Sequence, residues 1–210
     1  FYLQPKCNMA TGELVSMEAL ARWQKSDGTF VSPEEFIPLF ESSGFITRFD
    51  MYIWKSVCKT LAAWQDKGCK LVPISINVSM IDITNIDVPQ YLSMLTEQYH
   101  ISPEYLPVEI TESVFAESNT IVKNTITRFH KKGFYVLMDD FGSGYSSLNV
   151  LKDANVDYLK LDMKFMQIDA KNKGKGIQIL KSIVDMAYRL GLVIIAEGVE
   201  TKEQSEILKS

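Results

Sequence analysis

Short apolar runs alternate with longer amphipathic segments along the chain, and this alternation constrains the fold more than any other feature of the sequence. The segment from Arg48 to about Lys67 shows the helical pattern clearly, with Ile53, Val57, Leu61 and Trp64 at helical spacing. Short apolar runs between such segments are typical of parallel strands covered on the outside by helices. The expected strands are 1–4, 13–20, 71–78, 106–110, 134–138, 156–161 and 192–196. The expected helices are 33–42, 48–67, 89–99, 119–132, 146–152, 176–190 and a last one from 202.

This order of elements favours a TIM-like (β/α)8 barrel over an open dinucleotide-binding sheet. A dinucleotide-binding sheet needs a glycine-rich phosphate fingerprint after its first strand, and the sequence has none there. The first expected strand starts at Phe1 itself, and the pattern of the last expected helix continues to Ser210. We therefore expect one domain over residues 1–210 that is incomplete at both ends, with the last strand and helix unit of the barrel truncated in this chain.

The stretch from Val136 to Leu148 combines a buried strand with an acidic turn. An apolar run leads directly into Asp139 and Asp140, and Gly142 follows two residues later. Adjacent carboxylates at the end of a buried strand repel each other, and burying them is costly unless a cation lies beside them. Hard oxygen ligands favour Mg²⁺, Mn²⁺ or Ca²⁺. The alternative is a solvated loop in which these acids cap a helix.

Polar side chains also occupy the carboxyl ends of the other expected strands. In a (β/α)8 barrel these ends form one rim, so side chains there converge on a single site. Several carboxylates around one axis are typical of a site for two divalent cations, which activates water in phosphoryl displacement. Arg22 lies close enough to Glu18 to bind a phosphate oxygen, although a surface arginine is an equal alternative. The rim residues are Glu18, Asn77, Glu109, Asp139, Asp140, Lys160, Asp162 and Glu197.

Composition excludes several other classes of function. The formal net charge is −4 and no block of Lys or Arg is present, which argues against binding of a nucleic acid polymer. Only two histidines occur, without zinc-ligand spacing, so a zinc site is not expected. No apolar run is long enough to span a bilayer, and three cysteines, an odd number without paired spacing, favour a reducing compartment. We expect the chain in the cytoplasm, including the case of a cytoplasmic domain on a membrane-anchored protein.

The rim residues, in this order, resemble the EAL domain of bacterial cyclic-di-GMP phosphodiesterases. The family name is spelled by Glu18-Ala19-Leu20, and the resemblance covers the whole chain. The motifs are Gln4-Pro5, Glu18-Ala-Leu-Ala-Arg22-Trp23, Asn77-Val-Ser79, Glu109-Ile-Thr-Glu112, Asp139-Asp-Phe-Gly-Ser-Gly-Tyr-Ser-Ser147, Lys160-Leu-Asp162 and Ala196-Glu-Gly-Val-Glu-Thr201. The resemblance implies a TIM-like barrel whose first strand runs antiparallel to the rest. It also implies hydrolysis of cyclic-di-GMP to linear pGpG with two Mg²⁺ or Mn²⁺ ions.

The resemblance assigns expected roles to individual residues. The first metal would be held by Glu18, Asn77, Glu109 and Asp139. Asp139 would bridge to the second metal, with Asp140 and Glu197 beside it. Lys160 would position or help activate the water, and Glu18, Lys160 and Glu197 are the expected catalytic residues. Substrate contacts would come from Gln4, Arg22, Asp162 and Glu200. Glu112 would anchor the loop Phe141 to Ser147, which in the family couples the site to dimerisation.

Two alternatives to the phosphodiesterase hypothesis stay open from the sequence. The first is a receptor that binds cyclic-di-GMP without cleaving it, and the second is a metal-dependent barrel that acts on another substrate. The family's last strand carries a Gln-Gly motif, and the sequence ends at Ser210 before this motif occurs. We also expect a homodimer through the Phe141–Ser147 region and a sensory or cyclase domain that precedes Phe1 in the full protein.

Overall fold

The computed structural model describes residues 1–117, 119–142, 151, 154–162, 173–199 and 202–209. Within these residues the main sheet has the order β1-β2-β5-β6-β7-β8-β9. β1 pairs antiparallel with β2, and the following neighbours all pair in parallel. The bounds are β1 Tyr2–Cys7, β2 Leu14–Leu20, β5 Ile74–Asn77, β6 Val108–Thr111, β7 Val136–Phe141, β8 Tyr158–Asp162 and β9 Val193–Glu197. The expected TIM-like architecture with an antiparallel first strand is confirmed.

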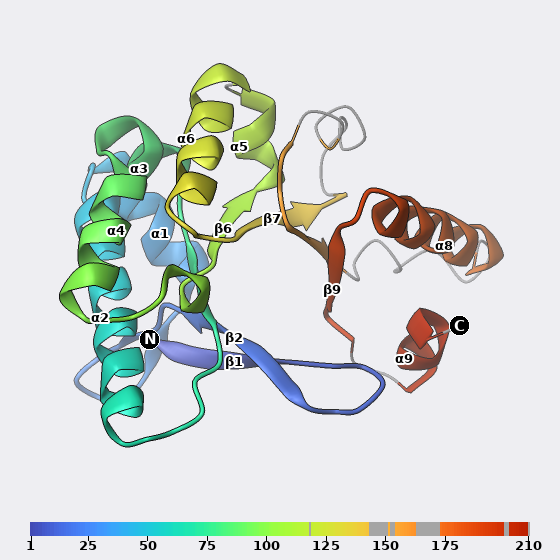
Figure 1. Ribbon diagram of the computed structural model, residues 1–210, viewed down its shortest axis with the longest axis horizontal. Coiled ribbons are helices and arrows are strands. Elements are labelled where there is room, and N and C mark those ends of the chain that lie inside the picture. The colour runs from blue at the N-terminus through green and yellow to red at the C-terminus, as the bar shows by residue number, and fades with distance from the viewer. Residues whose placement is uncertain (118, 143–150, 152–153, 163–172, 200–201, 210) are drawn as a thin grey trace.

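Helices cover the outside of this curved sheet (Figure 1). They are α1 (Pro33–Ser42), α2 (Ile46–Asp66), α3 (Met80–Asn85), α4 (Val88–Gln98), α5 (Glu112–Glu117), α6 (Asn119–Lys131), α8 (Lys173–Arg189) and α9 (Lys202–Lys209). A short 3-10 turn, η1 (Pro103–Tyr105), precedes β6, and a two-stranded hairpin of β3 (Trp23–Gln24) and β4 (Phe30–Val31) stands beside the main sheet. None of the described helices is both long and apolar enough to cross a membrane.

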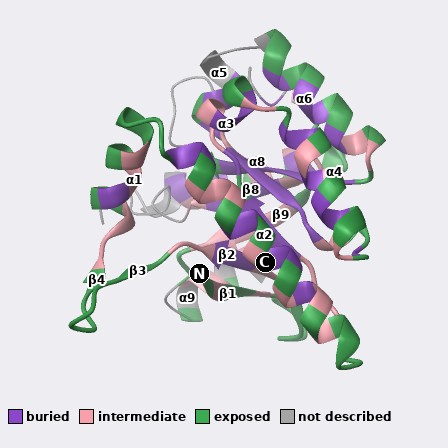
Figure 2. Cartoon of the chain, turned by 90° about the vertical axis from the view of Figure 1, so that its left-hand side faces the viewer, coloured by how far each residue is buried: buried purple, intermediate pink, exposed green. Residues whose placement is uncertain are grey.

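The core lies between the strands and the inner faces of these helices. Figure 2 shows the buried residues gathered on the strands and on the helix faces that cover them. The face of α2 that contains Ile53, Trp54, Val57 and Leu61 is buried in this core. The indole Nε1–H of Trp54 also donates to the backbone oxygen of Asn77, at 3.0 Å. α2 therefore fixes the carboxyl end of β5 as well as covering the sheet.

Two helix starts follow directly from capping side chains. The hydroxyl of Ser32 accepts from the N–H of Glu34 at the start of α1, which confirms the start expected from the sequence. Ser79 and Asp82 form a reciprocal capping box at the start of α3. This capping box begins two residues after Asn77, so the chain leaves the end of β5 through an ordered turn.

The structure corrects several expected boundaries. β1 continues through Pro5 to Cys7, whereas we expected it to end at Gln4. Proline is tolerated there because β1 is an edge strand of the described sheet, so one side of its backbone needs no partner. β5 begins at Ile74 rather than Leu71, since Pro73 cannot donate a ladder hydrogen bond. The short helices α3 and α5 were not expected, and most of the expected helix 146–152 lies outside the described residues.

Candidate metal centre at the carboxyl ends of the strands

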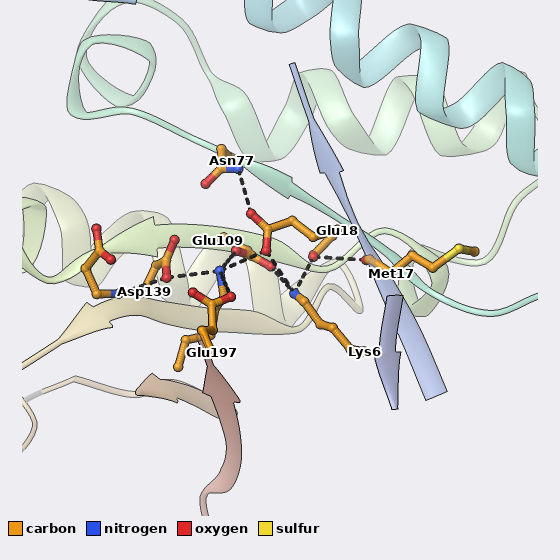
Figure 3. Close-up of polar contacts among 10 residues, drawn as sticks. Lys6, Met17, Glu18, Asn77, Glu109, Asp139 and Glu197 are labelled. Carbon is orange, nitrogen blue, oxygen red and sulfur yellow. Dashed lines mark hydrogen bonds and ion pairs between the residues drawn. The ribbon is translucent and has the colours of Figure 1, made fainter. Parts of the chain in front are cut away.

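Three carboxylates from three different strands meet at one end of the barrel. Glu18 of β2, Glu109 of β6 and Asp139 of β7 are buried, and each has a carboxylate oxygen within 4.8 Å of the others. The strand β5 lies between β2 and β6 and aligns their ends. Glu18 of β2 pairs with Ser75 of β5, and Glu109 of β6 pairs with Asn77, two residues further along β5. Figure 3 shows these side chains pointing toward one another, with Glu197 at the end of β9 facing the same centre.

The ammonium group of Lys160 lies in the middle of these acids. Its Nζ is 3.0 Å from Glu18 Oε2, 2.5 Å from Glu109 Oε2 and 3.0 Å from Asp139 Oδ1. It is also 2.9 Å from Oε1 of Glu197, and the Lys160 side chain is 1% exposed. Burial alone would lower the pKa of Lys160, but the surrounding carboxylates raise it well above its ordinary value. Lys160 is therefore a charged donor, and the strand-end pattern placed it correctly.

A second ammonium, that of the partly buried Lys6, lies on the β1 side of the acids and was not predicted from the sequence. Its Nζ is 2.5 Å from Glu109 Oε1, 2.9 Å from Ser75 Oγ and 3.5 Å from Glu18 Oε2. The available signal was its position two residues after Gln4. Gln4 pairs with Glu18 in the antiparallel register, so Lys6 faces the same side of the sheet. The rule for carboxyl ends of parallel strands does not apply to β1, because β1 runs antiparallel to its neighbour, so it did not predict Lys6.

The pKa shifts of the acids follow the placement of the two lysines. Burial alone would raise the pKa of Glu109, but the ammonium groups of Lys6 and Lys160 outweigh it and hold the pKa below its ordinary value. Burial raises the pKa of Asp139, with Lys160 opposing and Glu109 reinforcing the shift. Burial likewise raises the pKa of Glu197, against the effect of Lys160. Burial thus outweighs the effect of Lys160 at Asp139 and Glu197, whereas two ammonium groups outweigh burial at Glu109.

This donor set fits a hard divalent cation. Four carboxylates, those of Glu18, Glu109, Asp139 and Glu197, surround two ammonium groups, and charge left unbalanced in a buried site is costly. Carboxylate oxygens are the ligands that Mg²⁺ and Mn²⁺ prefer. Glu18, Glu197 and Lys6 also line a cavity of about 1470 Å³ between β1 and β9. Other lining residues, such as Pro73, Pro107 and Val193, lie at or just before the first residues of β5, β6 and β9, so this cavity extends toward the amino ends of the strands.

Two further predicted residues adjoin the cluster. The amide Nδ2 of Asn77 donates to Oε1 of Glu18 at 3.4 Å, and this side chain sits at the exposed edge of the site. Asp140 is exposed and has a left-handed backbone with φ 55°, and its N–H donates to Oδ1 of Asp139 at 2.8 Å. The turn after Asp139 therefore holds the Asp139 carboxylate through the backbone of Asp140.

Glu112 links the end of β6 to the end of β7. Its buried carboxylate accepts from the N–H of Gly142 at 2.9 Å through Oε2. This contact is what an anchor for the following loop requires. Residues 143–147 of that loop lie outside the described residues, so the loop-anchoring role of Glu112 stays a prediction.

The predicted substrate contacts are more scattered. Gln4 is exposed on β1 directly opposite Glu18, and Asp162 is half-buried at the end of β8 opposite Glu197. Arg22 is exposed, and its Nη1 donates to the backbone oxygen of Ala21 at 2.7 Å rather than to the acids. Glu200 lies outside the described residues. The structure thus brings Gln4 and Asp162 to the strands that carry the site, while Arg22 points back to its own backbone.

Comparisons with known proteins place these features in one family. The sequence matches the family model described as EAL domain over residues 1–210. It is 36% identical over 209 residues to the probable cyclic di-GMP phosphodiesterase PdeB of Escherichia coli (strain K12), covering 99% of this chain and 39% of that protein. It is 31% identical over 207 residues to the cyclic di-GMP phosphodiesterase PA2567 of Pseudomonas aeruginosa, covering 99% and 35%.

A solved structure agrees with the sequence relatives. The structure described as PaMucR phosphodiesterase, c-di-GMP complex, superposes with a TM-score of 0.89 at 29% identity, covering 99% of this chain and 83% of that chain. This chain spans well under half of the length of PdeB and of PA2567. The similarity therefore concerns one part of each of these larger relatives.

Proposed function

Because the chain belongs to the EAL domain family, we propose that it hydrolyses cyclic-di-GMP to linear pGpG with the help of two Mg²⁺ or Mn²⁺ ions. The observation that carries this proposal is the buried cluster of Glu18, Glu109 and Asp139 around the ammonium of Lys160. The names of PdeB and PA2567 and the ligand of the PaMucR structure support the choice of substrate. We also propose that residues 1–210 act as one EAL phosphodiesterase domain within a longer protein.

The oxygen donors would divide between two cations. Glu18, Asn77, Glu109 and Asp139 would hold the first ion, and Asp139, Asp140 and Glu197 would hold the second. When bound, the two ions supply a nucleophilic water at neutral pH and neutralise charge on the phosphate. The protein contributes the rigid placement of the donors, since most of them lie on or beside paired strands.

Lys160 acts as a charged hydrogen-bond donor in this scheme. Its carboxylate neighbours keep it protonated, so it cannot remove a proton from water. It can instead donate to the oxygen of the attacking water and to a phosphate oxygen, and so hold both in line for reaction. The water oxygen forms a bond to phosphorus while the bond from phosphorus to the 3′-oxygen breaks. The water gives up one proton as it attacks and the 3′-oxygen takes up one proton as it leaves, so pGpG carries a 5′-phosphate and a 3′-hydroxyl.

The substrate would be held by residues around the rim. Gln4 faces Glu18 across the β1–β2 pair, and Asp162 lies beside the end of β9. Arg22 would have to leave the backbone oxygen of Ala21 to bind a phosphate oxygen. Glu200 is proposed as a further contact on the strength of its motif alone.

The experiment that tests the proposal compares two matched glutamate substitutions. Glu18→Gln removes a central carboxylate, and we expect it to lower formation of pGpG by at least about 100-fold. Glu13→Gln makes the same change at an exposed residue that pairs with Lys70, and we expect no loss. Turnover is measured by chromatographic detection of pGpG with Mg²⁺ or Mn²⁺ supplied. Tight binding of cyclic-di-GMP without any pGpG would support the receptor alternative instead.

Larger assembly is a separate proposal. We propose a homodimer through the Phe141–Ser147 region and a sensory or cyclase domain ahead of Phe1, in keeping with the greater length of the relatives. Light scattering of the purified chain tests the homodimer, which predicts twice the mass of the 23.9 kDa chain. A monomer at all concentrations tested would contradict it.

A further inference from the structure

The two oxygens of Glu109 are each matched with a different lysine. Oε1 lies 2.5 Å from the Nζ of Lys6, and Oε2 lies 2.5 Å from the Nζ of Lys160. Glu109 itself is 1% exposed. Figure 3 shows Lys6 reaching Glu109 from β1, on the side away from Asp139. One carboxylate of the centre is therefore paired on both of its oxygens, each with a different ammonium group.

The two lysines differ in how tightly they are held. Lys160 has three other carboxylate partners, so it can turn away from Glu109 and still be compensated. Lys6 lies against Glu109 on the β1 side of the cluster, and its side chain is 9% exposed. Its Nζ donates to Oγ of Ser75, and that buried hydroxyl donates in turn to the backbone oxygen of Met17 at 3.2 Å. Lys6 thus has a fixed position that an incoming cation cannot easily change.

We propose that Lys6 sets the metal preference of this centre by keeping Oε1 of Glu109 occupied, so that Glu109 offers a divalent cation one oxygen rather than both. The inference rests on the proposed metal site and names a positioning residue for it. A cation bound at Oε1 would lie next to the ammonium of Lys6, and the two positive charges would repel each other. Glu109 then binds through Oε2 alone.

Single-oxygen binding distinguishes between cations. Mg²⁺ and Mn²⁺ accept octahedral sites in which each carboxylate gives one oxygen, whereas Ca²⁺ takes more oxygens at longer distances and often binds both oxygens of a carboxylate. Blocking Oε1 therefore disfavours Ca²⁺ more than Mn²⁺. Removing Lys6 would release this oxygen and also remove a nearby positive charge. Both effects strengthen Ca²⁺ binding, and only the loss of charge helps Mn²⁺.

The test is calorimetric titration of the 210-residue chain with Mn²⁺ and with Ca²⁺, without nucleotide. Lys6→Met replaces the ammonium with an apolar group of similar length, and we expect the ratio of Ca²⁺ to Mn²⁺ association constants to rise about tenfold. Lys6→Arg keeps a charged donor, and the ratio should stay within about twofold of the wild-type value. Lys70→Met removes an exposed lysine, which pairs only with Glu13 among the described residues, and should leave the ratio unchanged.

A second variant covers the case in which Lys6→Met does not fold. Ser75→Ala keeps the charge of Lys6 but removes the hydroxyl that anchors it, and we expect a smaller rise in the ratio, about threefold. Circular dichroism of each metal-free variant reports whether the fold is retained. An unchanged ratio in the folded variants would overturn the inference.

This outcome is separable from the proposed function. If the wild-type chain makes pGpG and Lys6→Met leaves the ratio unchanged, only the proposed role of Lys6 is wrong. A wild-type chain that binds both cations without hydrolysing cyclic-di-GMP would sink the enzyme proposal, and the role of Lys6 would still be tested by the ratio. A chain that binds neither cation would overturn both.

Discussion

The carboxyl group of Asp50 on α2 offers the sharpest test of the electrostatics of this fold. Burial, reinforced by the neighbouring carboxylate of Asp82, raises the pKa of Asp50 from 3.8 to about 8. Asp82 is fully buried, and its Oδ2 accepts from the N–H and the hydroxyl of Ser79 at 2.9 and 2.7 Å. Asp82 accepts both capping contacts through this oxygen, and its proximity disfavours the charged form of Asp50.

The sign of the effect on stability follows from this proton. The folded chain keeps the proton of Asp50 up to about pH 8, whereas the unfolded chain releases it near pH 4. The contribution of Asp50 to stability is fully present below the unfolded pKa, falls as the pH rises and is lost by the folded pKa. A shift of about 4 units corresponds to at most about 6 kcal/mol. Relaxation and entry of water reduce such shifts, so we expect about 2 kcal/mol between about pH 5.5 and about pH 9.

The substitution Asp50→Asn isolates this contribution. Asparagine is neutral at every pH and can donate an N–H to Asp82. Over this pH range the free energy of unfolding should therefore fall by about 2 kcal/mol less in the Asp50→Asn variant than in the wild type. Asp66→Asn makes the same change at an exposed position of the same helix, and its pH dependence should match the wild type. Urea unfolding in metal-free buffer provides the measurement. Parallel pH curves for the wild type and Asp50→Asn would refute the reasoning.

Two further substitutions test the packing around the site. Lys160→Met removes the central ammonium, so we expect turnover to fall at least about 100-fold and the metal-free chain to lose about 3 kcal/mol of stability in urea, because the acids lose their shared partner. Stability equal to wild type would show that the acids do not depend on Lys160. Trp54→Phe removes the donor to the backbone oxygen of Asn77, and we expect a loss of about 2 kcal/mol and about threefold weaker Mn²⁺ binding by calorimetry. Trp64→Phe on the same helix is the control, and equal Mn²⁺ affinity in both variants would contradict a role of α2 in placing Asn77.

The sequence predicted the central features of this site because parallel strands follow a simple rule. Apolar runs predicted the seven strands of the main sheet, and the polar residue at each carboxyl end then had to lie on one rim. Glu18, Glu109, Asp139 and Lys160 are close together for this reason. The rule requires only the direction of the strands, and it does not require their exact boundaries.

Contacts that depend on register or on a side-chain conformation were not predictable in this way. Lys6 lies on the antiparallel strand, so its contact with Glu109 depends on the β1–β2 register and on how far β1 extends beyond Pro5. Arg22 follows β2 as expected, but its long side chain has several possible partners and here donates to Ala21. The capping box of Ser79 and Asp82 was visible in the sequence as a serine followed three residues later by an acid. It was overlooked because the helix that it starts is short.

The distribution of charge also indicates where in the cluster a divalent cation is most favourable. Both lysines contact Glu109, and its pKa lies below the ordinary value. Asp139 and Glu197 have only Lys160 between them among the described residues, and their pKa values are raised. Lys6 adds its positive charge beside Glu18 and Glu109. Asp140, next to Asp139, adds a further carboxylate at the exposed edge of the site. In the proposed site, a dication beside Asp139 would lie farther from the ammonium of Lys6 than one at Oε1 of Glu109, and so would be repelled less by it (Figure 3).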